Sequence, residues 1–241
     1  MSKIVIANWK MSPNTLAEAE DLFRASPGAI VCPPFVYLEE LSKVESIATL
    51  GAQDIAFSDE PGQTGEVSGE MLRRLGVKYV IIGHSDRRWK LGESDEIVNK
   101  KLKLTSNSGL TPIVCLGEKS RDSDFKDFLR NQTLATFNDL LSEQIEKYLI
   151  VYEPVWAIST TPGARPDTPE SALESIRIIK EILTENWNLK IENLPFLYGG
   201  SVTSVNVRDF LSVSEILGVL VGGASVNKEE FKKILEIASN V

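Results

Sequence analysis

Apolar residues along the chain gather in eight short runs that are separated by longer amphipathic segments. Each run is almost continuously apolar and does not alternate between apolar and polar positions. Strands that are buried on both faces, as in parallel sheets, have this pattern. The predicted strands are IVIAN (4–8), AIVCPP (29–34), IATLGAQ (47–53), YVIIGH (79–84), PIVCLG (112–117), LIVYEP (149–154), FLYGGS (196–201) and GVLVGGAS (218–225).

Between these runs, apolar residues recur at helical spacing. Three of the segments carry start signals, in which a capping side chain precedes a glutamate by three residues or a proline by one. These signals are Thr15 with Glu18, Asn227 with Glu230, and Thr168 with Pro169. The expected helices span roughly residues 15–26, 36–44, 69–75, 94–108, 123–147, 168–186, 203–212 and 227–240.

Strand and helix alternate eight times over the 241 residues, which favours an α/β fold of the closed (β/α)8 barrel type. An open, doubly wound sheet would show a similar alternation, so the pattern leaves that alternative open. No linker, low-complexity tract or shift in composition marks a boundary. We therefore expect residues 1–241 to form a single domain.

Polar residues and glycines stand at the carboxyl ends of several predicted strands. In a barrel these ends meet at one rim, where catalytic residues come from different strands. The rim residues are Asn8 and Lys10 after the first strand, His84 after the fourth, Glu153 after the sixth, Ser201 after the seventh, and Gly222 and Gly223 after the eighth.

The composition limits the expected partners and location. Acidic residues outnumber basic ones by 34 to 26 and give a net charge of −8, which argues against nucleic acid as a partner. An anion site would therefore need local cations, backbone N–H groups and helix N-termini. No apolar run has the length of a bilayer and the start lacks a signal-peptide pattern, so we expect a cytoplasmic protein without membrane contact. Cys32 and Cys115 lie in apolar runs and are expected to be buried free thiols.

Three rim residues have the chemistry for proton transfer on an anion. Glu153 places a charge at the end of an apolar run, which is costly unless the charge is paired or functional. Lys10 could be an ordinary surface lysine, but at a strand end it supplies local positive charge. His84, the only histidine, could be structural. Ser85 and Asp86 after it can begin a short helix whose N–H groups favour a neutral imidazole, able to donate a hydrogen bond to an oxyanion. With no second histidine, no metal site is expected.

Glycine pairs in YGGS (198–201) and VGGAS (221–225) follow the seventh and eighth predicted strands. Each pair alone could be an ordinary turn. Together they are more informative, because the loops after these two strands frequently form the phosphate site of a barrel.

Eight stretches, in order and over nearly the whole chain, resemble the triosephosphate isomerase family. They are ANWKM (7–11), TGEVS (64–68), GVKYVIIGHSDRR (76–88), LGESDE (91–96), CLGE (115–118), YEPVWAI (152–158), YGGSV (198–202) and LVGGASV (220–226). This family is itself the reference case for the TIM barrel and for its glutamate–histidine chemistry, so the roles below come with the resemblance.

The resemblance implies an intramolecular aldose–ketose isomerase of glycolysis and gluconeogenesis, without cofactor or metal. It would interconvert dihydroxyacetone phosphate and D-glyceraldehyde 3-phosphate through an enediolate. Glu153 would transfer the proton between carbons, neutral His84 would polarise the oxygens, and Lys10 and Asn8 would stabilise the enediolate. Phosphate would be held by N–H groups near Ser159, Ser201, Gly222 and Gly223.

The resemblance also implies supporting residues, a lid that excludes water, and a homodimer in which Thr64 approaches Asn8 and Lys10 of the partner subunit. The supporting residues would be Asp86, Glu93 and Cys115, the lid residues Pro154, Val155, Trp156, Ala157, Ile158, Thr160 and Thr161, and the interface residues Thr64, Gly65, Glu66 and Arg87.

Two segments depart from the family pattern. The lid continues as AISTTPGARPD (157–167) and is a few residues longer, with Ser159 and Thr161 where the family usually has glycine and Pro162 where it has lysine. If closure needs a positive φ at Ser159 or Thr161, strain of about 1–3 kcal/mol would alter the kinetics of the lid. Asp86 stands where the family has glutamate, so we expect its shorter side chain to reach less far toward Lys10.

Two other functions stay open at this point. Another phosphate-binding barrel, acting on a larger sugar or indole phosphate, would share the glycine loops. A catalytically silent phosphometabolite-binding barrel would keep the fold without turnover.

Overall fold

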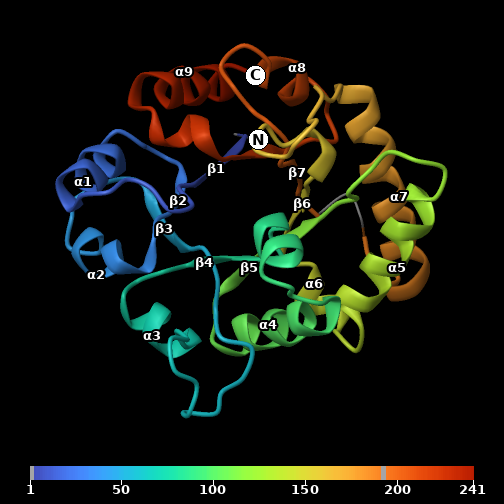
Figure 1. Cartoon of the computed structure of the whole chain (residues 1–241), viewed down its shortest axis with the longest axis horizontal. Helices are drawn as coiled ribbons and strands as arrows, with labels where there is room; N and C mark the ends of the chain where they lie inside the picture. Colours follow the sequence, from blue (N-terminus) through green and yellow to red (C-terminus); the bar gives the residue numbers. More distant parts are fainter. Residues whose placement is uncertain (1–2, 191–193) are drawn as a thin grey trace.

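The structure, a computed structural model, describes residues 3–190 and 194–241. Eight parallel strands pair in sequence order and β1 also pairs with β8, so the sheet closes into a barrel (Figure 1). This confirms the predicted (β/α)8 barrel and excludes the open sheet. The strands are β1 (Ile4–Asn8), β2 (Ile30–Cys32), β3 (Thr49–Ala52), β4 (Tyr79–Ile82), β5 (Thr111–Leu116), β6 (Leu149–Tyr152), β7 (Phe196–Tyr198) and β8 (Gly218–Val221).

Every strand coincides with one of the predicted apolar runs, and the glycine, proline or polar tail of most runs lies beyond the end of the strand. Side chains of the strands face two separate cores because they alternate in direction. One core fills the barrel and consists of strand residues alone. It contains Ile6, Ile30, Cys32, Ile81, Ile113, Cys115, Leu149, Val151, Leu197 and Leu220. The larger core lies between the strands and the helices.

Helices surround the barrel (Figure 1). They are α1 (Leu16–Arg24), α2 (Leu38–Leu41), α3 (Gly69–Arg74), α4 (Asp95–Asn107), α5 (Phe125–Phe137), α6 (Ser142–Ile145), α7 (Pro169–Trp187), α8 (Val207–Leu211) and α9 (Lys228–Ser239). Short helical turns are η1 (Phe35–Tyr37), η2 (Asp86–Lys90), η3 (Val155–Ala157) and η5 (Gly223–Val226).

Two of the three predicted helix starts are confirmed in full and one in part. Thr15 forms a complete capping box with Glu18, and Thr168 accepts the N–H of Ser171 with a proline at the first helical position. Asn227 caps α9 by accepting the Glu230 N–H. The Glu230 carboxylate does not complete that box, because it accepts the N–H and hydroxyl of Ser204 instead.

Three predicted helices were wrong in extent. The helix expected over 36–44 forms α2 only over Leu38–Leu41, preceded by the turn η1. The segment 123–147 is not one helix but α5 and α6, because Asp139 adopts a φ of 56° and the Asn138 carbonyl accepts a hydrogen bond from the side chain of Asn99. Expected over 203–212, α8 forms only over Val207–Leu211. The Thr203 N–H donates to the side chain of Asn206 and closes a turn ahead of the helix.

In the described part of the chain, no helix has both the length and the apolar character that crossing a membrane would require.

Candidate active site

A cavity of about 220 Å³ lies at the carboxyl ends of the strands and is lined by all the predicted catalytic and substrate-binding residues except Asn8. Its lining comes from the segments after β1, β4, β6, β7 and β8, as expected for the rim of a barrel. The lining residues are Lys10, His84, Glu153, Ile158, Ser159, Thr160, Gly199, Gly200, Ser201, Val202, Thr203, Leu220, Gly222, Gly223 and Ala224. Asn8 lines the adjoining cavity, which shares Lys10, His84 and Thr160 with this one.

Glu153 follows β6 directly, and only 2% of it is exposed. Its Oε2 accepts the Ser85 N–H at 2.8 Å and its Oε1 accepts the Ser85 hydroxyl at 2.8 Å. The Nε2 atom of His84 lies 3.0 Å from the same Oε1. The Glu153 carboxylate is thus buried, and the polar groups that follow β4 contact it directly. These contacts offset the free energy lost when the charge leaves water.

Gly117 fixes the backbone at this point. A Cβ built on Gly117, at the end of β5, would lie 1.9 Å from the carbonyl oxygen of Glu153. The Glu153 N–H also donates to the Leu116 carbonyl at 2.7 Å. The carbonyl of Glu153 can therefore pack this closely only against a residue without a side chain.

His84 is buried and its tautomer follows from its contacts. The Asp86 N–H donates to Nδ1 at 3.0 Å, so Nδ1 is an acceptor and carries no proton. The ring proton of a neutral imidazole is then on Nε2, which faces Glu153 and the cavity. The predicted helical turn is confirmed as η2 (Asp86–Lys90), and the N–H group of its first residue is the one that donates to Nδ1.

Lys10 has an unusual backbone with a φ of 52°. Its N–H donates to Asn8 Oδ1 at 3.1 Å, and its carbonyl accepts a hydrogen bond from Gln53 at 2.8 Å. Its Nζ lies 3.0 Å from Oδ2 of Asp86. A left-handed lysine costs free energy, and these contacts hold it with its ammonium at the cavity.

Although its side chain is shorter than that of glutamate, Asp86 forms a direct ion pair with Lys10. Burial by itself would raise the pKa of Asp86, but the hydrogen bond from Lys90 and the charge of Lys10 lower that pKa to about 2. The carboxylate is therefore ionised at neutral pH. The positive φ of Lys10 gives the side chain a direction that residue type alone does not indicate.

The loops after β6 and β7 meet over the cavity. The Ser159 N–H donates to the hydroxyl of Ser201 at 2.7 Å, and Gly222 precedes the turn η5 across the cavity. Neither Ser159 nor Thr161 has a positive φ, so the strain that was considered for these positions is not present in this conformation. The left-handed position of the segment is taken by Gly163, at a φ of 74°.

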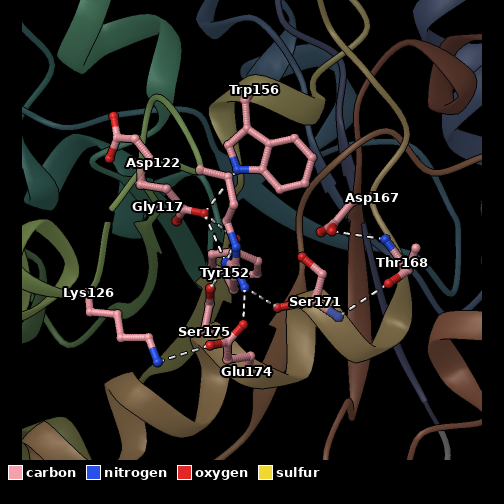
Figure 2. A network of polar contacts seen from close by, with 12 residues as sticks. Gly117, Asp122, Lys126, Tyr152, Trp156, Asp167, Thr168, Ser171, Glu174 and Ser175 are labelled. Atoms are coloured by element: carbon pink, nitrogen blue, oxygen red, sulfur yellow. Dashed lines mark hydrogen bonds and ion pairs between the residues drawn. The ribbon is translucent and has the colours of Figure 1, made fainter. Parts of the chain in front are cut away.

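The first lid residues, Pro154 to Ile158, include the turn η3 (Val155–Ala157). Trp156 donates its indole N–H to Oε1 of Glu118 at 2.9 Å, and Tyr152 donates its hydroxyl to the same atom at 2.7 Å. Figure 2 shows Gly117, Tyr152 and Trp156 in this group. Sequence reasoning quoted CLGE but gave Glu118 no role, because the pattern does not show which distant side chains a carboxylate will meet.

Two predicted supporting residues lie away from the cavity. Glu93 pairs with Nε of Arg87 at 2.6 Å and with Nζ of Lys101 at 2.5 Å. Cys115 belongs to the core inside the barrel, and burial raises the pKa of its thiol well above the ordinary value. The prediction that Cys32 and Cys115 are buried free thiols is confirmed.

The predicted interface residues Thr64, Gly65 and Glu66 are exposed on the segment between β3 and α3, which extends beyond the ring of helices (Figure 1). Arg87 lines the adjoining cavity, of about 410 Å³, beside Asn8, Lys10 and other residues. Three of the four predicted interface residues thus lie on a protruding segment, and the fourth, Arg87, lines a cavity at the rim.

Comparison with known proteins shows the family. The model of the family described as triosephosphate isomerase matches residues 3–238. Among curated proteins, triosephosphate isomerase of Trichodesmium erythraeum is 41% identical over 98% of this chain and 99% of its own, and that of Dictyoglomus thermophilum is 39% identical over 97% and 98%.

Among solved structures, the crystal structure of triosephosphate isomerase from Bartonella henselae superposes with a TM-score of 0.85 at 29% identity, and covers 98% of this chain and 99% of its own. The match spans the barrel and every loop that lines the cavity. The chain therefore belongs to the triosephosphate isomerase family.

Proposed function

We propose that this chain interconverts dihydroxyacetone phosphate and D-glyceraldehyde 3-phosphate, with Glu153 as the base that transfers the proton. One observation supports this most strongly. A nearly water-free carboxylate lies 3.0 Å from the Nε2 of His84, in a cavity that Lys10 also lines. An enediolate forms when a base removes a carbon proton, and it is stabilised by a hydrogen-bond donor and a cation near its oxygens. All three groups line this cavity, and the family to which the chain belongs is described by this activity.

In the proposed reaction Glu153 first exchanges its contacts with Ser85 for the substrate. Its carboxylate takes a proton from the carbon that bears the hydroxyl group beside the ketone. The electron pair moves onto the carbonyl oxygen and gives an enediolate. A proton also moves from the hydroxyl oxygen on the first carbon to the oxygen on the second, with Nε2 of His84 as the group that relays it. The same carboxylic acid then returns the carbon proton to the neighbouring carbon, so that the carbonyl group ends at the aldehyde position. No water or cofactor is consumed.

His84 and Lys10 stabilise the charge that develops on oxygen. The Nε2 proton of His84 is directed into the cavity because Nδ1 is occupied by the Asp86 N–H. Lys10 contributes a full positive charge and Asn8 holds the Lys10 backbone. Each such donor, fixed before the reaction, contributes about 10²–10³-fold in rate.

The phosphate group would lie between the lid and the loops after β7 and β8. Ser159, Ser201, Gly222 and Gly223 line that part of the cavity, and their backbone N–H groups and the Ser201 hydroxyl would hold the phosphate. Lys10 adds local charge, which this chain needs because its net charge of −8 repels anions. We further propose that residues 154–167 form a lid that excludes water during the reaction.

A coupled assay of glyceraldehyde 3-phosphate turnover tests this function on the natural chain and on Glu153→Ala. Loss of about three decades or more in kcat, with phosphate binding retained, supports proton transfer by Glu153. Absence of turnover in the natural chain, with the triose phosphates still bound, would instead favour a silent binding barrel.

We also propose that the chain is a homodimer in which residues 57–68 of each subunit fill the 410 Å³ cavity of the other. That cavity is open beside Lys10, and exposed apolar side chains lie around it. Met11 is 93% exposed and Leu91 is 66% exposed. Exposed apolar groups beside a cavity are typical of an interface, and the protruding segment carries a small-residue sequence, TGEVS, that could enter one.

The dimer is tested by sedimentation over a range of concentrations. Met11→Glu should give a monomer with much lower activity. Ile47→Glu changes an apolar residue of similar exposure, 78%, at the opposite end of the barrel, and should remain a dimer. A monomeric natural chain at micromolar concentration would refute the proposal. We also propose that residues 1–241 form one catalytic domain. We further propose that the protein is cytoplasmic, which microscopy of a fluorescently tagged chain can test.

A further inference from the structure

A cluster of polar and charged side chains outside the cavity connects the two ends of the proposed lid. The lid begins just after β6 and ends at Thr168, where α7 starts. Figure 2 shows Trp156, near the first end, linked through Tyr152 and its neighbours to Ser171, Ser175 and Glu174 on α7. The contacts below account for this link.

The first end of the lid is held by Glu118, of which only 1% is exposed. Its Oε1 accepts hydrogen bonds from Trp156 and Tyr152, and its carbonyl accepts the Val155 N–H at 3.0 Å. The position of the indole therefore depends on where this carboxylate lies.

Arg121 connects that carboxylate to the second end. Its Nη1 lies 3.3 Å from Oε1 of Glu118 and also donates to the hydroxyl of Ser175. Its Nη2 pairs with Glu174 at 2.6 Å and donates to the Ser171 carbonyl at 3.2 Å. The rigid guanidinium fork makes all these contacts at once, which a single ammonium could not do.

The charge balance makes Arg121 more than a surface residue. Glu118 is a buried carboxylate whose other two side-chain donors, Tyr152 and Trp156, are neutral. Without the guanidinium the buried carboxylate would lose its only cationic partner in the described part of the chain, and an unpaired buried charge favours a conformation closer to water. The Phe125 ring, 4.0 Å from the guanidinium carbon, packs against the same side chain. Side-chain exposure of Arg121 is only 14%.

We propose that Arg121 is a positioning residue that holds both ends of the lid, so that closure is limited to the tip at residues 159–165. This inference rests on the isomerase function proposed above. If the ends are fixed, few open conformations compete with the closed one. If they are loosened, the fraction of closed lid falls and the apparent affinity for substrate falls with it.

The variant Arg121→Gln tests the proposal through two measurements. The first is kcat and KM in the coupled assay, where kcat/KM should fall about tenfold, mainly through KM. The second is the indole N–H signal of Trp156 in protein labelled with ¹⁵N-tryptophan, assigned with Trp156→Phe. This signal should shift or broaden, with and without inorganic phosphate as the ligand.

Lys126→Gln is the matched control. Lys126 pairs with the same Glu174 at 3.1 Å, but Glu118 receives its charged contact from Arg121 and not from Lys126. This variant should therefore keep the natural kinetic constants and the natural Trp156 signal. An equal loss in both variants would show that Glu174 pairing in general, and not the link to Glu118, is responsible, which would overturn the proposal.

Glu174→Gln covers the case in which Arg121→Gln fails to fold, because Glu174 is 46% exposed and its loss is tolerable. It removes the charged contact of Arg121 with α7, leaves the contacts with Ser171 and Ser175, and should lower kcat/KM about threefold while moving the Trp156 signal. If Arg121→Gln folds, or Glu174→Gln in its place, and keeps both the natural kcat/KM and the natural Trp156 signal, the proposed role of Arg121 is refuted. An inactive natural chain would refute the proposed function, yet the Trp156 signal would still test the link.

Discussion

The close packing of Gly117 against Glu153 gives a quantitative prediction for Gly117→Ala. The added Cβ would lie 1.9 Å from the Glu153 carbonyl oxygen. A Cβ atom and an oxygen that are not bonded stay more than about 3.0 Å apart. The backbones at residue 117 and Glu153 must therefore separate by about 1 Å. The base is attached to the displaced residue, and a misplacement of about 1 Å can cost about 10²-fold in rate. We therefore expect kcat to fall about 10²-fold.

The assay is steady-state kinetics together with thermal unfolding, because the variant also loses stability. Gly51→Ala is the control, since its Cβ would meet Cys32 Sγ at 2.5 Å inside the barrel, far along the sheet from Glu153. It should lower the melting temperature and keep kcat. A folded Gly117→Ala with kcat within about threefold of the natural value would refute the idea that this contact sets the position of the base.

Two further predictions concern pH and the lid. Burial and, to a smaller extent, the charge of Glu93 raise the pKa of Asp54 from an ordinary 3.8 to about 6, although Lys101 beside it lowers that pKa. The folded state thus binds the proton more tightly than the unfolded state, and this group adds stability as pH falls through 6. In urea titrations, the stability of the natural chain relative to Asp54→Asn should rise by about 1 kcal/mol between about pH 7.5 and about pH 5, and a constant difference would contradict the shift. Ser201→Ala removes the acceptor of the Ser159 N–H; KM should rise about tenfold with kcat little changed, and an unchanged KM would count against a phosphate site there.

Sequence patterns predicted what depends on local periodicity. The continuous apolar run before Glu153 identified β6, and the proline after Thr168 located the start of α7. Continuous runs favour strands that are buried on both faces, and in this chain eight such strands close into a barrel. The rim position of the candidate residues followed from the same geometry.

Contacts between distant segments could not be predicted in this way. Ser85 and Glu153 are 68 residues apart, and nothing in either segment indicates that one caps the other. Lys10 reaches Asp86 because of a positive φ that its residue type does not favour. Arg121 was missed for a related reason: it stands in a polar loop where arginine is ordinary, and only the fold brings it to Glu118.

The break between α5 and α6 is an error of a different kind. Helical periodicity continues across 123–147, but Asp139 takes a left-handed conformation and ends the run. Aspartate and asparagine adopt that conformation more readily than most residues. The pair Asn138 and Asp139 therefore indicated a helix end, but the prediction followed the helical periodicity instead.

The central claim, proton transfer by Glu153, is tested most directly by exchange of substrate hydrogen with deuterated water. During turnover of dihydroxyacetone phosphate by the natural chain, deuterium should appear on the carbons beside the carbonyl groups of substrate and product. In folded Glu153→Ala that still binds phosphate, exchange should be slower by about three decades or more. Exchange at the natural rate in this variant would contradict the account, because another group would then be removing the proton.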